Sequence, residues 1–245
     1  MKVLITNDDG IEGEGIIALA KILSENHDVV IAAPKREQSG KCHALTARRE
    51  IEVTEPKFPI EVIKAYAIDG TPTDAVKIYM EAIASEKPDI VFSGVNNGAN
   101  LATDVTYSGT VGAALEGFLH NIPAVAVSRD KASVISYEEI ATKTVDFIEE
   151  VYKNKKLFFL NINFPKKFND NPKCKYCRLG VRDYINAFQR KEKEGKVFYV
   201  IGGEPLDIDK SEDTDIFAVN DGNISVTPLL SNVTDFEFME KFYCR

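Results

Sequence analysis

Hydrophobic positions in the first two thirds of the chain fall into short continuous runs separated by helix-spaced patterns. An apolar, β-branched run covers residues 2–6, apolar side chains recur at helical spacing over 16–23, and a second apolar run covers 29–33. Continuous runs of this length are typical of buried strands, and the spaced pattern is typical of an amphipathic helix. Because a strand, a helix and a strand follow one another, we expect the two strands to be parallel.

The same alternation continues to about residue 165. The pattern predicts further helices over 76–83, from about 110 and over 137–151, and further strands over 90–92, 124–127 and 157–162. We therefore predict an α/β fold for residues 1–165, with a Rossmann-like, mostly parallel sheet flanked by helices.

The C-terminal part, residues 166–245, has a different character. An apolar run lies at 197–201, and two shorter apolar runs flank Asn220-Asp221-Gly222. An Asp-Gly pair between apolar runs is a strong β-hairpin signal, and the pattern over 232–242 predicts a short helix. We expect a C-terminal elaboration made of a hairpin and a helical arm, and we expect it to mediate oligomerisation.

Composition narrows the function. With 245 residues, 44% of them hydrophobic, the chain is long enough to bury the core of one large domain. Thirty Lys and Arg against 38 Asp and Glu give a net charge of -8, which disfavours a nucleic-acid polymer as a partner. A small phosphate ester stays a candidate ligand, because one cation and a few backbone N–H groups neutralise it locally.

The expected location follows from the N-terminus, the apolar runs and the cysteines. The N-terminal residues hold too few consecutive apolar positions for an export signal, and no apolar run approaches the roughly 18 residues that suggest a membrane span. The cysteines, at positions 42, 174, 177 and 244, are too sparse for a disulfide framework. We therefore expect a cytoplasmic protein without a membrane partner.

Two adjacent carboxylates, Asp8 and Asp9, directly follow the first predicted strand. Ligands of open α/β sheets bind beyond the carboxyl ends of the strands. Like charges at such a place repel unless a cation lies between them, so the pair indicates a metal site. The alternative is a turn or a helix cap, in which Asp is also common.

The loops after later strands offer uncharged oxygen atoms. Ser39-Gly40 lies in the loop over 35–46, and residues 93–100 have the sequence SGVNNGAN. Oxygen ligands without His or Cys favour Mg²⁺ or Mn²⁺ over Zn²⁺. Each segment is ambiguous by itself, since Ser-Gly and glycine-rich turns also occur where nothing binds.

A phosphate cradle is predicted where the helix near residue 110 begins. Ser108, Gly109 and Thr110 combine hydroxyls with a glycine at a helix N-terminus, whose exposed N–H groups attract anions. Asn100 supplies a further amide donor. An ordinary helix N-cap is the alternative for this segment.

The motifs together identify a family. In order along the chain they are TNDDG at 6–10, Ser39-Gly40, GTPTD at 70–74, SGVNNGAN at 93–100, YSGTVGAALEG at 107–117, NINFP at 161–165 and ISVTPL at 224–229. This set resembles the survival protein E (SurE) nucleotidase family over nearly the whole chain.

The resemblance implies a metal-dependent phosphatase that hydrolyses nucleoside monophosphates, a 5'-nucleotidase, with 3'-nucleotidase and exopolyphosphatase activity left open. It implies one divalent cation, Mg²⁺ or Mn²⁺, with ligands at Asp8, Asp9, Ser39 and Asn96. It also suggests a homodimer or homotetramer.

The expected mechanism is in-line attack on phosphorus by a water molecule that the cation activates, with Asp8 and Asp9 as the catalytic carboxylates. The phosphoryl oxygens would be held by Asn100 and the helix start at 108–110. Attack by Asp8 itself, through an aspartyl-phosphate, stays open.

Two residue types outside the main motifs leave alternatives open. His43 is either a proton donor or phosphate contact, or a packing residue of its loop. Cys174 and Cys177 are either two thiols or an incidental disulfide in a variable loop, or a redox pair, or half of a zinc site completed across a dimer.

Two rival functions complete the set of hypotheses. Residues 13–18, GEGIIA, match the dinucleotide-binding pattern G-x-G-x-x-A, which would suit an NADP-dependent oxidoreductase. A pyrophosphate placed there would lie beside four carboxylates, at positions 8, 9, 12 and 14, which would repel it. The oxidoreductase hypothesis is therefore disfavoured. A non-catalytic nucleotide-binding module is the second alternative.

Overall fold

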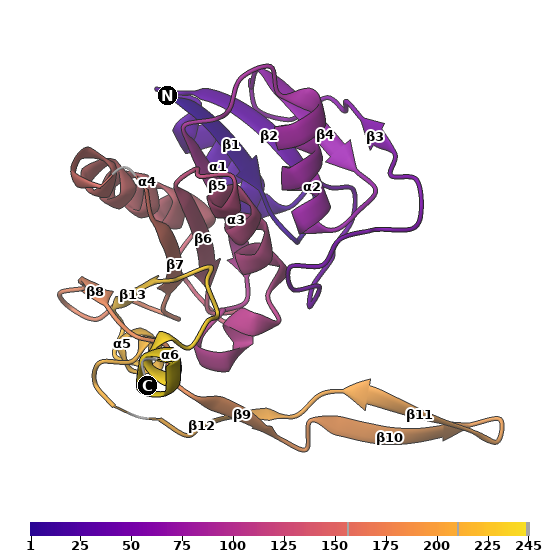
Figure 1. Cartoon of the computed structure of the whole chain (residues 1–245), viewed down its shortest axis with the longest axis vertical. Coiled ribbons are helices and arrows are strands. Elements are labelled where there is room, and N and C mark those ends of the chain that lie inside the picture. Colours follow the sequence, from indigo (N-terminus) through magenta and orange to yellow (C-terminus); the bar gives the residue numbers. More distant parts are fainter. Residues whose placement is uncertain (156, 210, 244–245) are drawn as a thin grey trace.

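A computed structural model describes residues 1–155, 157–209 and 211–243 (Figure 1). Its centre is a nine-stranded sheet with the order β3-β4-β2-β1-β5-β6-β7-β13-β8. The strands of this sheet are β1 (Lys2–Thr6), β2 (Asp28–Pro34), β3 (Val53–Thr54), β4 (Lys64–Ile68), β5 (Ile90–Asn97), β6 (Ala124–Arg129), β7 (Phe159–Phe164), β8 (Cys174–Tyr176) and β13 (Ile224–Pro228).

Six neighbouring strands, from β4 to β7, pair in parallel. Five of them match strands predicted from the sequence, whereas β4 was not predicted. The helices along the sheet are α1 (Glu14–Leu23), α2 (Pro72–Ile78), which continues as the π-turn η1 (Tyr79–Ile83), α3 (Gly109–Leu119) and α4 (Tyr137–Asn154). A short 3-10 helix, η2 (Ala102–Thr106), precedes α3. The predicted α/β class, a mostly parallel sheet flanked by helices, is confirmed.

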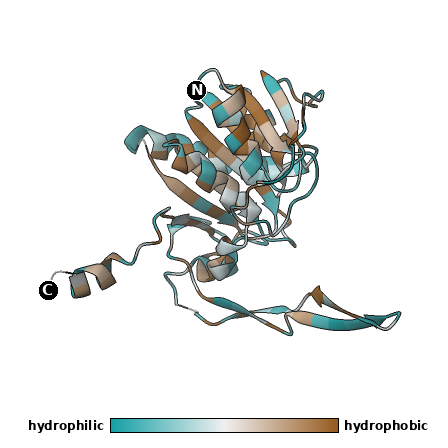
Figure 2. Cartoon of the chain, turned by 45° about the vertical axis from the view of Figure 1, so that its right-hand side comes forward, coloured by the Kyte–Doolittle hydropathy of each residue, from teal (hydrophilic) through white to brown (hydrophobic). Residues whose placement is uncertain are grey.

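Alternate residues of the buried strands face two separate hydrophobic cores. Val3 and Ile5 of β1 pack in the core that contains the apolar faces of α1 and α4. Leu4, between them, packs in the core that contains α2 and α3. This alternation follows from the two-residue period of a strand, and it explains why strands buried on both faces appear as continuous apolar runs. Figure 2 shows the apolar character of the central strands.

The predicted hairpin around Asp221-Gly222 is wrong. Residues Asp215–Asn220 form helix α5, which Thr214 caps by accepting a hydrogen bond from the N–H of Phe217 at 3.2 Å. The helix ends in a Schellman motif: Gly222 has φ +76 and its N–H donates to Val219, while the N–H of Asn223 donates to Ala218. A glycine after a polar residue suits a hairpin turn and a helix C-terminus equally well. The local sequence therefore did not discriminate between these two structures.

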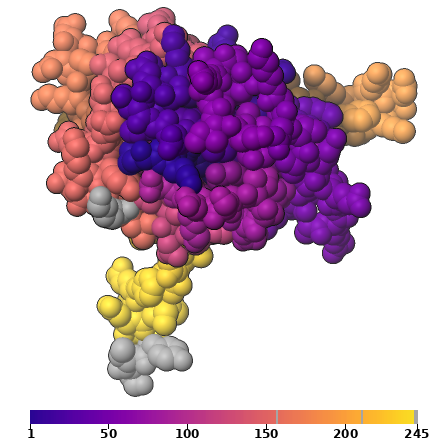
Figure 3. Space-filling view, turned by 90° about the horizontal axis from the view of Figure 1, so that it is seen from above, coloured from indigo at the N-terminus to yellow at the C-terminus, as the bar shows by residue number. Residues whose placement is uncertain are grey.

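The C-terminal third both completes the sheet and projects from it. β13 returns to pair antiparallel with β7, and β8 pairs with β13. The remaining strands, β9 (Arg182–Ile185), β10 (Phe188–Lys193), β11 (Lys196–Ile201) and β12 (Glu204–Asp207), form a long two-stranded arm. The arm and helix α6 (Phe236–Tyr243) stand away from the body of the molecule (Figures 1 and 3).

Candidate functional site

A cleft of about 560 Å³ lies at the carboxyl ends of β1 and β5, as the strand-end rule predicts. It brings together segments from five parts of the chain. Its lining residues are Asp8, Asp9, Glu37, Ser39, Gly40, Asn96, Asn97, Gly98, Ala99, Asn100, Asp104, Tyr107, Ser108, Lys131 and Tyr184. Four carboxylates against one Lys make the cleft strongly negative, so a phosphate needs a cation to enter it.

Asp8 is the most deeply buried carboxylate of the cleft, with 4% of the residue exposed. The pKa of Asp8 is raised to about 6: burial is the largest cause, the hydroxyl of Thr110 opposes the rise by donating to the carboxylate at 2.5 Å, and the neighbouring charge of Asp9 adds to the rise. The negative charge of such a buried carboxylate is stabilised by binding either a proton or a metal ion.

Asp9 lies beside Asp8 and is also perturbed. Burial raises the pKa of Asp9, and the nearby carboxylate of Glu37 adds to that rise. The backbone N–H of Asn97 donates to Oδ2 of Asp9 at 3.3 Å and opposes it. Three acidic groups thus converge with too little positive charge among them, which is the electrostatic condition that a divalent cation relieves.

The turn after β1 fixes these two carboxylates. The side-chain amide of Asn7 donates to the carbonyl of Gly10 at 2.8 Å, and the N–H of Gly10 donates back to Asn7 at 3.2 Å. Gly10 has φ +100, a conformation that other residues adopt only with strain. The motif Asn-Asp-Asp-Gly is therefore a closed turn that presents both aspartates to the cleft.

Ser39 reaches the cleft on the loop that follows β2. Its hydroxyl donates to Oε1 of Glu37 at 2.8 Å, which leaves the oxygen lone pairs of Ser39 to act as a ligand. The N–H of Gln38 donates to the carbonyl of Asp8 at 2.7 Å, and the N–H of Cys42 donates to Tyr107 at 3.1 Å. These two bonds tie the loop to the cleft on either side of Ser39.

Asn96 is presented by an irregularity in β5. The pairing of β5 with β6 shifts register between Ser93 and Asn96, and Gly94 within the shift has φ +136. The amide nitrogen of Asn96 donates to the carbonyl of Gly98 at 2.6 Å, so the amide oxygen is the atom offered to a cation.

The predicted phosphate residues divide into two groups. Asn100 and Ser108 line the cleft; the amide of Asn100 donates to Ser128 at 2.7 Å, and the hydroxyl of Ser108 accepts from Val111 as the N-cap of α3. Gly109 packs so closely that an added Cβ would lie 3.0 Å from Oδ2 of Asp8.

Thr110 lies behind the carboxylate rather than in the cleft. It is fully buried and its hydroxyl is bonded to Asp8, so its side chain supports Asp8 instead of touching a bound phosphate. Two backbone N–H groups of this first turn are already bonded within the protein: that of Val111 donates to the Ser108 hydroxyl at 3.1 Å, and that of Thr110 donates to Asp8.

His43 lies outside the cleft, on the outer side of α3. Its Nε2 pairs with Oε2 of Glu116 at 2.7 Å, and it lines a separate, largely apolar hollow. This placement favours the packing interpretation of His43, because the side chain is directed toward Glu116 rather than toward the two aspartates.

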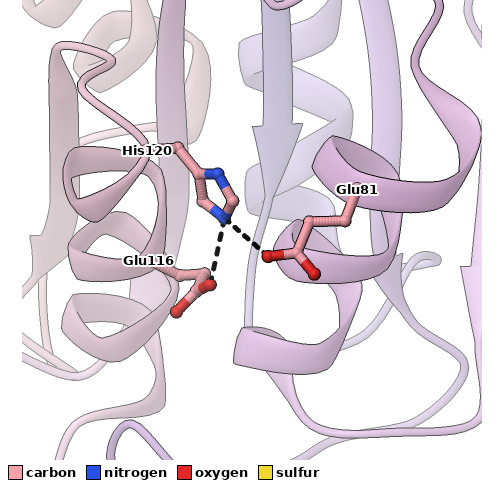
Figure 4. Close-up of side chains that lie close together, drawn as sticks. All are labelled: Glu81, Glu116 and His120. Carbon is pink, nitrogen blue, oxygen red and sulfur yellow. Dashed lines mark hydrogen bonds and ion pairs between the residues drawn. The ribbon is translucent and has the colours of Figure 1, made fainter.

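Glu116 also belongs to a second group of potential ligands, with Glu81 and His120 (Figure 4). Their ligand atoms lie within 4.8 Å of one another. Lys77 already forms ion pairs with Glu81 at 2.6 Å and with Glu116 at 3.3 Å. We interpret the group as an ion-pair network that joins α2 to α3, since the Lys77 ammonium supplies the positive charge that a metal would bring.

The cysteines of the described segments are free thiols: Cys42, Cys174 and Cys177. Burial raises the pKa of both Cys174 and Cys177, so neither thiol is activated. Cys244 lies outside the described residues.

Several cleft residues were not predicted from the sequence. Asn97 sits inside a recognised motif but was not singled out, while Glu37 and Lys131 carry no local signal. Asp104 and Tyr184 are joined by a hydrogen bond across 80 positions of sequence, which only the folded arm reveals.

Comparisons with known proteins agree with this geometry. The family model described as "Survival protein SurE" matches residues 3–186. The 5'-nucleotidase SurE of Pelotomaculum thermopropionicum is 42% identical and covers 98% of this chain and 93% of its own. That of Thermoanaerobacter sp. is 40% identical over 98% of this chain and 96% of its own.

A solved structure supports the same relationship. The crystal structure of the SurE protein from Aquifex aeolicus matches with a TM-score of 0.83 and 35% identity, covering 100% of this chain and 99% of that one. Neither the family model nor these relatives supports the oxidoreductase or the non-catalytic alternative. None of the helices in the described part of the chain has the length and apolar character needed to cross a bilayer.

Proposed function

The chain belongs to the SurE family, and from that premise we propose that it is a metal-dependent 5'-nucleotidase whose active site is the acidic cleft. The observation that carries the proposal is the pair Asp8 and Asp9, adjacent carboxylates with raised pKa values at a strand end, of which Asp8 is buried and Asp9 is half-buried. Nucleoside monophosphates are the proposed substrates. Hydrolysis of 3'-nucleotides and of polyphosphate are open extensions of the same chemistry.

The residues of the cleft fit one hard divalent cation, Mg²⁺ or Mn²⁺. Asp8 and Asp9 would supply charge, and Ser39 and Asn96 would supply neutral oxygen atoms from two other loops. All four donors are oxygen atoms, which suits these ions better than zinc. The fit rests on the converging charges of the two aspartates and Glu37, which Arg129 offsets only in part, since the pKa of Asp9 stays raised.

The chain's own groups would perform the remaining tasks of phosphate hydrolysis. The bound cation would neutralise phosphate charge and lower the pKa of an attacking water. Asn100, Ser108 and the backbone N–H of Gly109 at the start of α3 would orient the phosphoryl oxygens. Thr110 would hold the Asp8 carboxylate in one orientation through its hydrogen bond.

The nucleophile is testable separately. Acid quenching of the reaction with labelled substrate should trap no phosphoenzyme if water attacks, whereas an adduct on Asp8 would replace the water mechanism with an aspartyl-phosphate route.

The activity is tested by phosphate release from AMP and GMP. Purified protein should release phosphate in the presence of Mn²⁺ and lose that activity in EDTA. A protein that binds AMP but releases no phosphate with Mn²⁺ or Mg²⁺ would instead be the non-catalytic module.

We also propose a homodimer or homotetramer in which residues from about 166 onward take part. The arm exposes five consecutive apolar side chains at 197–201, and α6 exposes Phe236, Phe238, Met239 and Phe242. An apolar surface of this kind on a soluble monomer usually marks an association site. A cytoplasmic location is part of the proposal, supported by the free thiols.

A further inference from the structure

The segment GTPTD at 70–74 does not line the cleft, and the proposed function does not use it. Thr71 and Asp74 form a capping box at the start of α2. The hydroxyl of Thr71 accepts from the N–H of Asp74 at 3.0 Å, and Oδ2 of Asp74 accepts from the N–H of Thr71 at 2.8 Å. A capping box needs only these two bonds. Asp74 is only 3% exposed, and a buried carboxylate requires further donors.

Both residues of the capping box form further bonds, and all of these reach the loop that carries Ser39. The N–H of Thr46 donates to Oδ1 of Asp74 at 3.0 Å, and the hydroxyl of Thr46 donates to Oδ2 at 2.6 Å. The hydroxyl of Thr71 donates to the carbonyl of Ala44 at 2.6 Å. The helix cap does not need these bonds, so their effect is to fix a largely exposed stretch of loop.

Helix α3 holds the same loop at Cys42 and His43. Gly112 packs so closely against the loop that an added Cβ would lie 2.3 Å from the carbonyl oxygen of Cys42. Cys42 has φ +53, which a residue other than glycine keeps only where surrounding contacts impose it. Nε2 of His43 pairs with Oε2 of Glu116 at 2.7 Å. Helices α2 and α3 thus fasten the loop a few residues beyond Ser39.

We propose, on the basis of the proposed function, that these contacts of α2 and α3 form a clamp that positions Ser39 as a ligand of the cation. Ser39 is followed by Gly40, around which an added Cβ would meet nothing within 4 Å, so packing does not fix this part of the loop. The bond from Gln38 to Asp8 holds one side of it, and the clamp holds the other. Without the clamp, the loop would have to be ordered when the cation binds, which weakens the affinity for the cation.

Mn²⁺ binding without substrate, measured by calorimetric titration of the full chain, tests the clamp. Thr46→Val removes the hydroxyl bond to Asp74 and should raise the Kd for Mn²⁺ by about 10-fold, the lower end of the range for groups that support a metal ligand. Thr46→Ser keeps the hydroxyl and should bind Mn²⁺ as the wild type does. Thr142→Val is the matched control, because it loses a hydroxyl bond to Glu138 within α4, and its Kd should not change.

Two glycines of α3 provide a second comparison. Gly112→Ala would push the loop away from the helix and should also raise the Kd for Mn²⁺ by about 10-fold. In Gly117→Ala the added Cβ would lie 2.7 Å from Cγ2 of Val91 in β5, so the strain falls on the core and not on the loop. Gly117→Ala should therefore lower the melting temperature of the metal-free protein and leave the Kd for Mn²⁺ unchanged.

The outcomes separate the clamp from the fold and from the metal site. An unchanged Kd in Thr46→Val would overturn the clamp. Equal weakening of Mn²⁺ binding in Thr142→Val or Gly117→Ala would also overturn it, because lost stability alone would then explain the effect. A wild type that binds no Mn²⁺ would instead count against the proposed function. If Gly112→Ala does not fold, the comparison of Thr46→Val with Thr46→Ser still decides.

Discussion

The hydroxyl of Thr110 donates a hydrogen bond to Oδ1 of the buried Asp8 carboxylate, with 2.5 Å between the two oxygens. The bond joins the first turn of α3 to the loop after β1. It favours the charged form of a group that burial drives toward protonation. Thr110 thus favours the ionised form of Asp8, the form that the proposed cation would bind.

Thr110→Val should raise the pKa of Asp8 by about one to two units, because a charge-assisted hydrogen bond is worth roughly 1.5 to 3 kcal/mol and one unit corresponds to about 1.4 kcal/mol. The acidic limb of the pH profile of kcat/KM should move to higher pH by that amount. Thr144→Val is the control, since the buried Thr144 hydroxyl donates only to the carbonyl of Ile140 in α4. A limb that stays in place in Thr110→Val would show that the bond does not tune Asp8.

Glu116 should make stability depend on pH in the acidic range. Burial raises its pKa, but the hydrogen bonds from His43 and Lys77 outweigh burial and hold the pKa at about 2, below the ordinary 4.5. A lowered carboxyl pKa gives stability that is present above pH 4.5 and is lost as the pH falls toward 2. The loss over that window should reach about 3 kcal/mol.

Urea unfolding of the wild type and Glu116→Gln at several pH values measures this effect. The variant should be less stable than the wild type at pH 7, and the gap should close as the pH approaches 2. Glu138→Gln, which breaks an exposed ion pair with Lys21, should leave the unfolding curve nearly unchanged. If the difference in unfolding free energy between the wild type and Glu116→Gln does not change with pH, Glu116 is not the group that causes the pH dependence.

Association should depend on the arm and the C-terminal helix. Light scattering at micromolar concentration is expected to find a dimer or tetramer. A chain truncated before Ser231 should form a smaller oligomer or a monomer. Phe198→Glu, which places a charge on the exposed arm, should also weaken association. A monodisperse wild-type monomer would contradict this expectation.

The parts of the structure that the sequence predicted are those governed by local rules. Burial on both faces produces continuous apolar runs, so β1, β2 and β7 and the helices between strands were placed correctly. The strand-end rule selected the loops of Asp8, Ser39 and Asn96, and the fold brings these three to one cleft.

The parts that were missed depend on distant segments or on ambiguous signals. Tyr184 joins the cleft only because β9 folds against η2, a contact with no local signature. Thr110 was expected to touch phosphate, but the side chain turns toward Asp8 because a buried carboxylate needs a donor. The Asp-Gly pair at 221–222 suits a hairpin and a helix end equally well, and the cap at Thr214 decided for the helix.

The central claim, that Asp8 and Asp9 share one cation, is tested most directly by thermal unfolding of Asp9→Asn with EDTA and with Mn²⁺. Without metal, the variant should melt at the same temperature as the wild type or higher, because it removes one of two crowded carboxylates. Asp146→Asn, an exposed position on α4, is the control.

Mn²⁺ at about 100 times its Kd should stabilise the wild type and the control by roughly 2.7 kcal/mol, a rise in Tm of about 5 to 10 °C. In Asp9→Asn this rise should shrink or vanish, together with most of the activity. An undiminished Mn²⁺ shift in Asp9→Asn would contradict the account and remove Asp9 from the metal site.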